Sequence, residues 1–275
     1  MDKQTIAFIG GGNMAHSLVG GLIAGGHPPE RIWVADPFVD QIDSHRHRHR
    51  VNVTQENSEA AAHADVVVLA TKPQVLAEAA EEIRAAVAEN GPLVLSIAAG
   101  IREPDLRRWL GGDPRIVRAM PNTPSLLQAG ATVLYANPEV SQDEKATAQT
   151  IMEAVGLALW VDDENHMDAV TATSGSGPAY FFLVMEAMIE AAKKLDLPAE
   201  VAEKLVLQTA LGAARMAVEG EDDPASLRRK VTSPGGTTAA ALEVLESEGL
   251  GESFERALKA ARDRSRSLSE EFGQA

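Results

Sequence analysis

Short, continuous apolar runs alternate with amphipathic segments through residues 1–161. The first run, IAFI at 6–9, is typical of a strand that is buried on both faces of a parallel sheet. The same pattern predicts further strands at 31–36, 65–70, 93–97, 116–120, 131–135 and 157–161. The segments between them predict helices that include 16–24, 75–89 and 143–155. This alternation predicts an α/β domain with a largely parallel sheet over residues 1–161.

The pattern changes at about residue 162, after which no apolar run clearly predicts a strand. Helical periodicity predicts an all-helical domain over 162–275, with helices at 164–173, 180–195, 199–218, 237–246 and 251–271. Residues 179–188 read AYFFLVMEAM and are apolar on nearly every side. A helix of this kind is buried on more than one face. One thin layer of helices cannot supply that burial, so we expect an intertwined homodimer.

The first predicted strand runs into a glycine-rich turn, GGGNMA at 10–15, and then into a helix. In this G-x-G-x-x-A form, Gly10 supplies the tight turn, Gly12 lets backbone approach a pyrophosphate, and Ala15 allows close packing of helix on strand. The helix N-terminus then faces the phosphates. The alternative is a glycine-rich turn without a ligand. The flanking strand and helix, with Asp36 beyond a second strand, favour a dinucleotide site in a Rossmann-like domain.

Asp36 ends the second predicted strand, where a Rossmann-like half holds the adenosine ribose. A carboxylate there favours ribose hydroxyls over a 2′-phosphate. The tract HRHRHR at 45–50 could instead offer positive charge to a 2′-phosphate. By its place in the chain this tract lies along or beyond the next helix, so a solvated helix end is the preferred interpretation. The choice between NADH and NADPH stays open on these residues.

Three further loops follow predicted strands. Ligands in open parallel sheets bind at the carboxyl ends of the strands, so the loops at 70–73 and 97–100 are expected to edge the cofactor groove. The turn PNTP at 121–124 follows the strand at 116–120. Its two prolines make it rigid and suit it to fixing the nicotinamide or the substrate face. Alternatively, it only terminates the strand.

The composition of the 275 residues excludes several classes of site and partner. The chain has no cysteine, which excludes disulfides, thiolate metal sites and a cysteine nucleophile, and we expect no metal site. The formal net charge of −15 argues against nucleic acid as the main partner, because phosphate backbones bind Lys and Arg. No apolar run approaches the ~20 residues that a membrane span needs. The chain opens directly into a strand without a leader, so we expect a cytoplasmic protein.

A second glycine turn, SPGG at 233–236, leads into the predicted helix at 237–246. Consecutive backbone N–H groups in such a turn at a helix N-terminus form an anion site suited to a carboxylate. Ser233, Thr237 and Thr238 add hydroxyls at the same place. The alternative is an ordinary helix cap, in which one of the threonines bonds the amides of the first turn.

The order of the two domains suggests hydride transfer, with the helical part completing the substrate pocket of a nicotinamide enzyme. The glycine turn at 173–180, which contains Ser176, also precedes a predicted helix. It could close the pocket from another side.

Six segments resemble, in their order and spacing, the pyrroline-5-carboxylate reductases: FIGGGNMA, TKPQ, SIAAG, MPNTP, DAVTATSGSGPAYFF and VTSPGGTT. The resemblance covers essentially the whole chain, and the last two segments are the most specific. It implies NAD(P)H-dependent reduction of the C=N bond of 1-pyrroline-5-carboxylate to L-proline, the last step of proline biosynthesis. It also implies a helical domain that interlocks in a homodimer, and dimers that often assemble into decamers.

The resemblance also implies roles for individual residues. Thr238 would be the catalytic residue, with a hydrogen bond to the ring nitrogen of the substrate. The substrate-binding residues would be Ser176, Ser233, Gly235, Gly236, Thr237 and Thr238. The cofactor-binding residues would be Gly10, Gly12, Asn13, Met14, Asp36, Asn57, Ala70, Lys72, Pro73, Ala98, Ala99, Met120, Pro121 and Asn122. The family usually favours NADPH and often has a small polar residue in place of Asp36, so NADPH is expected while NADH stays possible.

The expected chemistry does not demand a His, Lys or Glu base in the helical domain. A cyclic imine is readily protonated near neutral pH, so positioning and a hydrogen bond supply much of the acceleration. The alternatives are another imine reductase, a β-hydroxyacid-type dehydrogenase and an NAD(P)-binding regulator without turnover. Such dehydrogenases need a lysine on the helix after a glycine turn, where this chain has PAYFF at 178–182. A regulator would usually carry a partner-binding or DNA-binding segment, and none is evident.

Overall fold

The computed structural model describes residues 4–273, and the contacts within the chain divide them into two units. The first unit joins the chain up to Ser176 to the segment from Ala260 onward, and the second unit runs from Gly177 to Lys259. The division by contacts lies at other positions than the domain boundary expected at 161/162, which stays a prediction.

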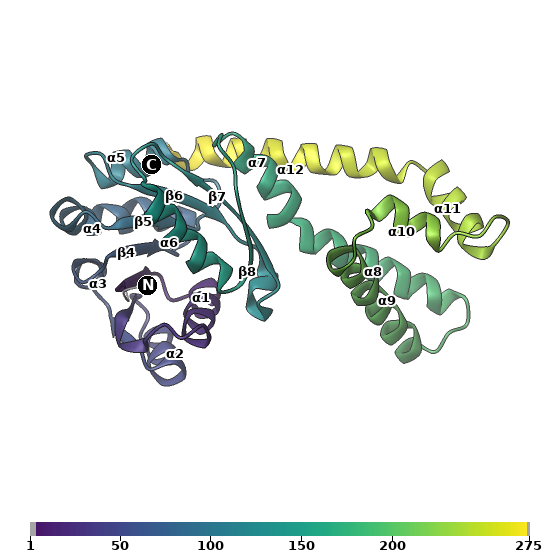
Figure 1. Cartoon of the computed structure of the whole chain (residues 1–275), viewed down its shortest axis with the longest axis horizontal. Coiled ribbons are helices and arrows are strands. Elements are labelled where there is room, and N and C mark those ends of the chain that lie inside the picture. The colour runs from purple at the N-terminus through teal and green to yellow at the C-terminus, as the bar shows by residue number, and fades with distance from the viewer. Residues whose placement is uncertain (1–3, 274–275) are drawn as a thin grey trace. The chain divides into compact units, whose positions relative to one another are not determined.

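One sheet forms the centre of the first unit (Figure 1). Its strand order is β3-β2-β1-β4-β5-β6-β7-β8. The strands are β1 (Ile6–Ile9), β2 (Ile32–Ala35), β3 (Asn52–Thr54), β4 (Val66–Leu69), β5 (Leu93–Ser96), β6 (Ile116–Met120), β7 (Gly130–Ala136) and β8 (Gly156–Trp160). Strands β1 to β6 pair in parallel. Strand β7 is antiparallel to β6 and parallel to β8. The predicted Rossmann-like class with a largely parallel sheet is therefore confirmed.

Helices cover both faces of this sheet. They are α1 (Asn13–Ala24), α2 (Val39–His49), α3 (Asn57–Ala62), α4 (Leu76–Asn90), α5 (Glu103–Leu110) and α6 (Gln142–Glu153). On one face Phe8 and Val68 pack with α1 and α6, and on the other Ile9 and Leu69 pack with α3, α4 and α5. Successive side chains of a strand point to opposite faces, so each short apolar run of the sequence supplies both cores.

The strand order changes direction between β1 and β4. The chain builds β1, β2 and β3 outward on one side, and then returns to place β4 on the other side of β1. The register aligns Ile9 with both Ala35 and Leu69, and Leu69 with Ser96. The carboxyl ends of these strands therefore lie along one edge of the sheet. Ligands of open α/β sheets bind at such an edge, at the point where the strand order reverses.

Several short elements are absent from the sequence-based prediction. Strand β3 has three half-buried residues, so its apolar signal is weak. Helix α5 and helix α10 (Pro224–Lys230) are also short. The helix predicted at 164–173 is α7 (His166–Val170), which continues into a π-helix (Thr171–Gly175).

The second unit is helical, as predicted. It contains α8 (Gly177–Lys194), α9 (Ala199–Glu219), α10, α11 (Thr237–Ser247) and the first part of α12 (Leu250–Gly273). Helix α8 buries only Gly177 within the described chain, and Phe181, Phe182 and Leu183 are 69%, 62% and 64% exposed. An apolar surface of this kind marks a protein interface. In residues 4–273, no helix has the length and apolar character that a membrane span requires.

The remainder of α12 belongs to the first unit by its contacts. The hydroxyl of Ser265 donates to Asp168 Oδ1 over 2.8 Å, and both side chains are buried. The guanidinium of Arg102 donates to the other oxygen of the same carboxylate over 3.0 Å. Burying a carboxylate is costly unless hydrogen bonds of this kind satisfy its oxygens. Asp168 thus joins the C-terminal segment to the loop that follows β5.

Gly21 supports a stability prediction, because α1 crosses the turn after α6 at this residue. A Cβ on Gly21 would lie 2.3 Å from the carbonyl oxygen of Ala154. We expect Gly21→Ala to lower the free energy of unfolding by roughly 1–3 kcal/mol, the cost typical of overpacking. In the matched variant Gly20→Ala, the added Cβ meets only His49, at 3.4 Å. This control should leave the Tm unchanged or raise it, since alanine favours a helix. Equal Tm values in calorimetry would contradict the close crossing.

Candidate active site

Gly10 lies where the turn after β1 passes the end of β4. Its φ of +103° is a conformation that favours glycine. A Cβ on it would lie 2.8 Å from the carbonyl carbon and oxygen of Ala70 and 2.9 Å from the nitrogen of Thr71. Its N–H donates to the carbonyl of Ala35 over 2.8 Å. The turn therefore needs glycine for both its conformation and its space.

The N-terminus of α1 opens from this turn. The N-cap residue is Gly12, which has no side chain, so no side-chain hydrogen bond caps the helix. Asn13 and Met14 are the first two helical residues. A Cβ on Gly12 would meet nothing within 4 Å. First-turn amides without a side-chain cap, beside open space, suit the binding of an anionic group such as a pyrophosphate.

Asp36 ties the glycine turn to the end of β2. It is 8% exposed. Its Oδ2 accepts the N–H of Gly11 over 2.8 Å, and its Oδ1 accepts the N–H of Phe38 over 2.9 Å. These two bonds fix the carboxylate beside the turn. At the end of β2 it brings negative charge to the place where a ribose would lie.

The histidine-arginine tract forms the last part of α2 and its C-cap, Arg50. The interpretation as a solvated helix end is right for its arginines and His47 but wrong for His45 and His49. His45 is fully buried and His49 is half-buried, while Arg46, His47 and Arg48 are exposed. Positions four apart share one face of a helix, and this face packs on α1. His45 Nε2 lies 3.0 Å from the carbonyl oxygen of Gly11.

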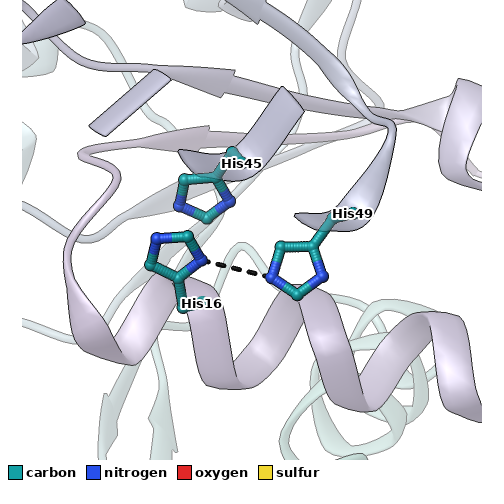
Figure 2. Close-up of side chains that lie close together, drawn as sticks. All are labelled: His16, His45 and His49. Atoms are coloured by element: carbon teal, nitrogen blue, oxygen red, sulfur yellow. Dashed lines mark hydrogen bonds between the residues drawn. The ribbon is translucent and has the colours of Figure 1, made fainter. Parts of the chain in front are cut away.

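A third histidine, His16 of α1, completes a cluster with these two (Figure 2). Its ring stacks on that of His45 with centroids 3.5 Å apart and planes 1° from parallel. Its Nδ1 lies 3.2 Å from Nε2 of His49. Burial lowers the pKa of His45 and of His49 to about 4, and it also lowers the pKa of His16. Repulsion among the rings and from Arg48 adds to this effect. His45 and His49 are therefore neutral at pH 7, and the lowered pKa of His16 favours its neutral form as well.

The other expected cofactor residues follow the same edge of the sheet. Ala70, Lys72 and Pro73 follow β4, and Ala98 and Ala99 follow β5. Asn57 begins α3, and its amide donates to Glu82 Oε2 over 2.5 Å. Sheet topology brings these loops and the glycine turn to one edge. Their role in binding a dinucleotide stays a prediction.

The turn after β6 does more than end a strand. Pro121 and Asn122 follow Met120, the last residue of β6. The Oδ1 of Asn122 accepts the N–H of Ala131 over 2.9 Å, and its Nδ2 donates to the carbonyl of Ser174 over 3.0 Å. This side chain thus holds the π-helix, and with it the adjacent Ser176, against the carboxyl end of β6.

The glycine turn before α11 lies in the second unit. Gly235 has a φ of +68°, and the N–H of Gly236 donates to the carbonyl of Ser233 over 3.0 Å. The N-cap of α11 is Gly236, so no side-chain hydrogen bond caps this helix. The alternative of an ordinary threonine cap is therefore wrong. Thr237 and Thr238 occupy the first two helical positions, and the uncapped amides beside them suit a carboxylate.

Sequence reasoning missed Gly11, His16, His45 and His49. The spacing of four between His45 and His49 was a usable signal, since such residues share a helix face. The contact of this face with α1 could not be read from the sequence, because it depends on how the two helices pack.

Comparisons with known proteins agree with this arrangement. Residues 164–268 match the sequence model described as pyrroline-5-carboxylate reductase dimerisation, and residues 5–100 match that of NADP oxidoreductase, coenzyme F420-dependent. A pyrroline-5-carboxylate reductase of Pseudomonas aeruginosa is 50% identical over 274 residues, which cover 100% of both chains. The chain belongs to the pyrroline-5-carboxylate reductase family.

Solved structures of other family members share the fold. A pyrroline-5-carboxylate reductase from Coxiella burnetii has a TM-score of 0.94 and 51% identity, covering 98% of this chain and 99% of that one. A pyrroline carboxylate reductase from Plasmodium falciparum, solved with NADP bound, has a TM-score of 0.85 and 29% identity, and the match covers 98% of this chain and 99% of that one. The family therefore retains this fold at low sequence identity.

Asp36 supports a prediction about cofactor choice. We expect Asp36→Ser to raise the affinity for NADPH relative to NADH at least fivefold, because charges about 4 Å apart in water repel by ~1 kcal/mol. Fluorescence titration with each dinucleotide measures this ratio without any substrate. Asp40→Ser, at an exposed position of α2, is the matched control. An unmoved ratio in Asp36→Ser would refute repulsion of the 2′-phosphate by this carboxylate.

Proposed function

We propose that this protein reduces the C=N bond of 1-pyrroline-5-carboxylate to give L-proline, with NADPH or NADH as the reductant. The observation that carries the proposal is 50% identity, over the entire length of both chains, to a protein named pyrroline-5-carboxylate reductase. The fold supports the proposal with a sheet edge suited to a dinucleotide and a helical region that matches the family's dimerisation model.

A bound reduced nicotinamide supplies the hydride. The open space beside Gly12 and the uncapped N-terminus of α1 fit its pyrophosphate. The rest of the chemistry concerns the placing of the substrate. The backbone amides from Gly236 to Thr238, with the hydroxyl of Ser233, hold the carboxylate of the ring. The hydroxyl of Thr238 forms a hydrogen bond with the ring nitrogen, and so orients the adjacent carbon. The cyclic imine is readily protonated near neutral pH, and the resulting iminium carbon accepts hydride without a strong acid. Orientation therefore supplies much of the acceleration.

The proposed cofactor is NADPH, with NADH as a second reductant. The match of residues 5–100 to an NADP oxidoreductase model and the NADP bound to the Plasmodium falciparum relative both support NADPH. The carboxylate of Asp36 favours ribose hydroxyls and so supports NADH.

The proposed active form is a homodimer. Its support is the apolar surface of α8, which a single chain leaves exposed, and the match of residues 164–268 to a dimerisation model. Assembly of the dimers into a decamer and a cytoplasmic location stay predictions.

Thr238 provides the test of the catalytic assignment. We expect Thr238→Ala to lower kcat/KM for 1-pyrroline-5-carboxylate by roughly tenfold or more, the value of one hydrogen bond made in the transition state. NADPH oxidation with this substrate measures the effect. Thr238→Ser keeps the hydroxyl and should retain most of the activity, whereas Thr238→Val keeps the shape and should lose it. An alanine variant as active as the native protein would remove Thr238 from the mechanism.

The dimer requirement can be tested on α8. Phe182→Glu places a charge within the exposed apolar surface and should yield a monomer without reductase activity, because the pocket needs interlocked helices. Light scattering gives the oligomeric state, and NADPH oxidation gives the activity. Lys194→Glu, at an exposed polar position of the same helix, should leave both unchanged. A fully active monomer would contradict the proposal.

A further inference from the structure

The three histidines between α1 and α2 take no part in the proposed reaction. His16, His45 and His49 each offer one ring nitrogen, and these atoms all lie within 4.8 Å of one another (Figure 2). We infer that His16, His45 and His49 form a binding site for one divalent transition-metal ion, of the class of Zn²⁺. The reaction proposed above neither uses this site nor depends on it.

The spacing of the nitrogens is close to that of a metal site. Zinc binds imidazole nitrogens at about 2.0–2.1 Å in a tetrahedron, which places two ligand nitrogens about 3.3 Å apart. His16 Nδ1 and His49 Nε2 are already 3.2 Å apart. The remaining separations, up to 4.8 Å, must shorten by about 1.5 Å to reach this geometry. Binding therefore requires a ring to turn, and the proton of the His16–His49 hydrogen bond must move to the other nitrogen of its ring.

His45 shows the hydrogen bonding expected of a ligand. Its Nε2 lies 3.0 Å from the carbonyl oxygen of Gly11, so Nε2 carries the proton that it donates. Its Nδ1 then carries a lone pair, and this buried atom has no hydrogen-bond partner in the described chain. A buried acceptor without a partner costs free energy. Histidines that bind metals usually donate their other N–H to a carbonyl or carboxylate in this way. A metal ion would satisfy Nδ1.

The stacking of His16 on His45 defines the movement that binding requires. Lone pairs of imidazole lie in the ring plane, and these two planes are parallel. Both rings cannot point at one ion in this arrangement, so one must turn about its Cα–Cβ bond. His16 is half-buried, whereas His45 is fully buried and held by Gly11. His16 is therefore the ring that turns.

The donor set indicates the class of ion. Three neutral imidazoles without a thiolate suit Zn²⁺, Ni²⁺ or Cu²⁺, whereas Ca²⁺ and Mg²⁺ prefer oxygen ligands. Three protein ligands also leave a fourth position for water. The positive charge of Arg48 opposes the ion, but this side chain is exposed and water screens it.

The position of the site couples it to the glycine turn. His45 holds the carbonyl of Gly11, and Asp36 holds the N–H of the same residue. An ion that fixes His45 therefore fixes the turn where the dinucleotide is proposed to bind. We expect the ion to change the affinity for NADPH, and this consequence alone rests on the proposed cofactor site.

Titration of the purified full-length protein with zinc chloride tests the site. We expect one ion per chain, with a Kd at least tenfold lower than in His16→Ala or His49→Ala. His47→Ala is the matched control, because His47 is exposed on the same helix. It should bind zinc as the native protein does. Circular dichroism of each variant confirms folding, and the tetrahedral absorption of added Co²⁺ gives a second readout. No ion in the native protein, or equal weakening by His47→Ala, would overturn the inference.

A second titration tests the coupling. Zinc chloride should shift the Kd for NADPH at least threefold in the native protein and leave it unchanged in His49→Ala. Zinc binding without this shift would refute the coupling and leave the metal site standing. Zinc binding in a protein that binds no dinucleotide would refute the proposed cofactor site instead.

Discussion

The close approach of the backbone at Gly10 to the backbone at Ala70 is the constraint that positions the loops at the carboxyl ends of the strands. Strands β1 and β4 pair up to Ile9 and Leu69, and directly beyond them a Cβ on Gly10 would lie 2.8 Å from the carbonyl of Ala70. The N–H of the next residue, Gly11, donates to Asp36, and its carbonyl oxygen accepts a hydrogen bond from His45 Nε2. One turn thus aligns the open end of α1, the acidic end of β2 and the histidine cluster. A bulkier residue at Gly10 would displace all three together.

The second constraint is the apolar surface that α8 cannot bury within its own chain. Residues such as Phe181 and Leu183 are more than half exposed. Their burial stabilises a dimer, since fully covering a side chain of this size contributes about 1.5–3 kcal/mol. The turn before α11 lies in the same unit as α8, whereas the glycine turn at Gly10 lies in the other unit. The proposed function therefore links assembly to substrate binding, because the turn before α11 and the apolar surface of α8 belong to the same unit.

Most of the fold could be predicted because its strands are short apolar runs and its turns need glycine. The run at 6–9 and the turn at Gly10 predicted the sheet edge, and the apolar sequence of α8 predicted a partner. Strand β3 could not be predicted, since its three residues are half-buried and carry little apolar signal. The inward face of the tract at 45–50 was missed for another reason. Burial of His45 depends on the packing of α2 against α1, and a polar sequence does not reveal which of its residues a neighbouring helix covers.

The central claim is that a ring with a carboxylate, held by the turn at Thr238, meets a reduced nicotinamide at the carboxyl edge of the sheet. A crystal structure of the homodimer with NADP⁺ and L-proline tests it most directly. The account predicts proline in the turn before α11, with its nitrogen within hydrogen-bonding distance of the Thr238 hydroxyl and its ring against the nicotinamide. A turn at Thr238 that lies far from the nicotinamide in every pairing of subunits would contradict it.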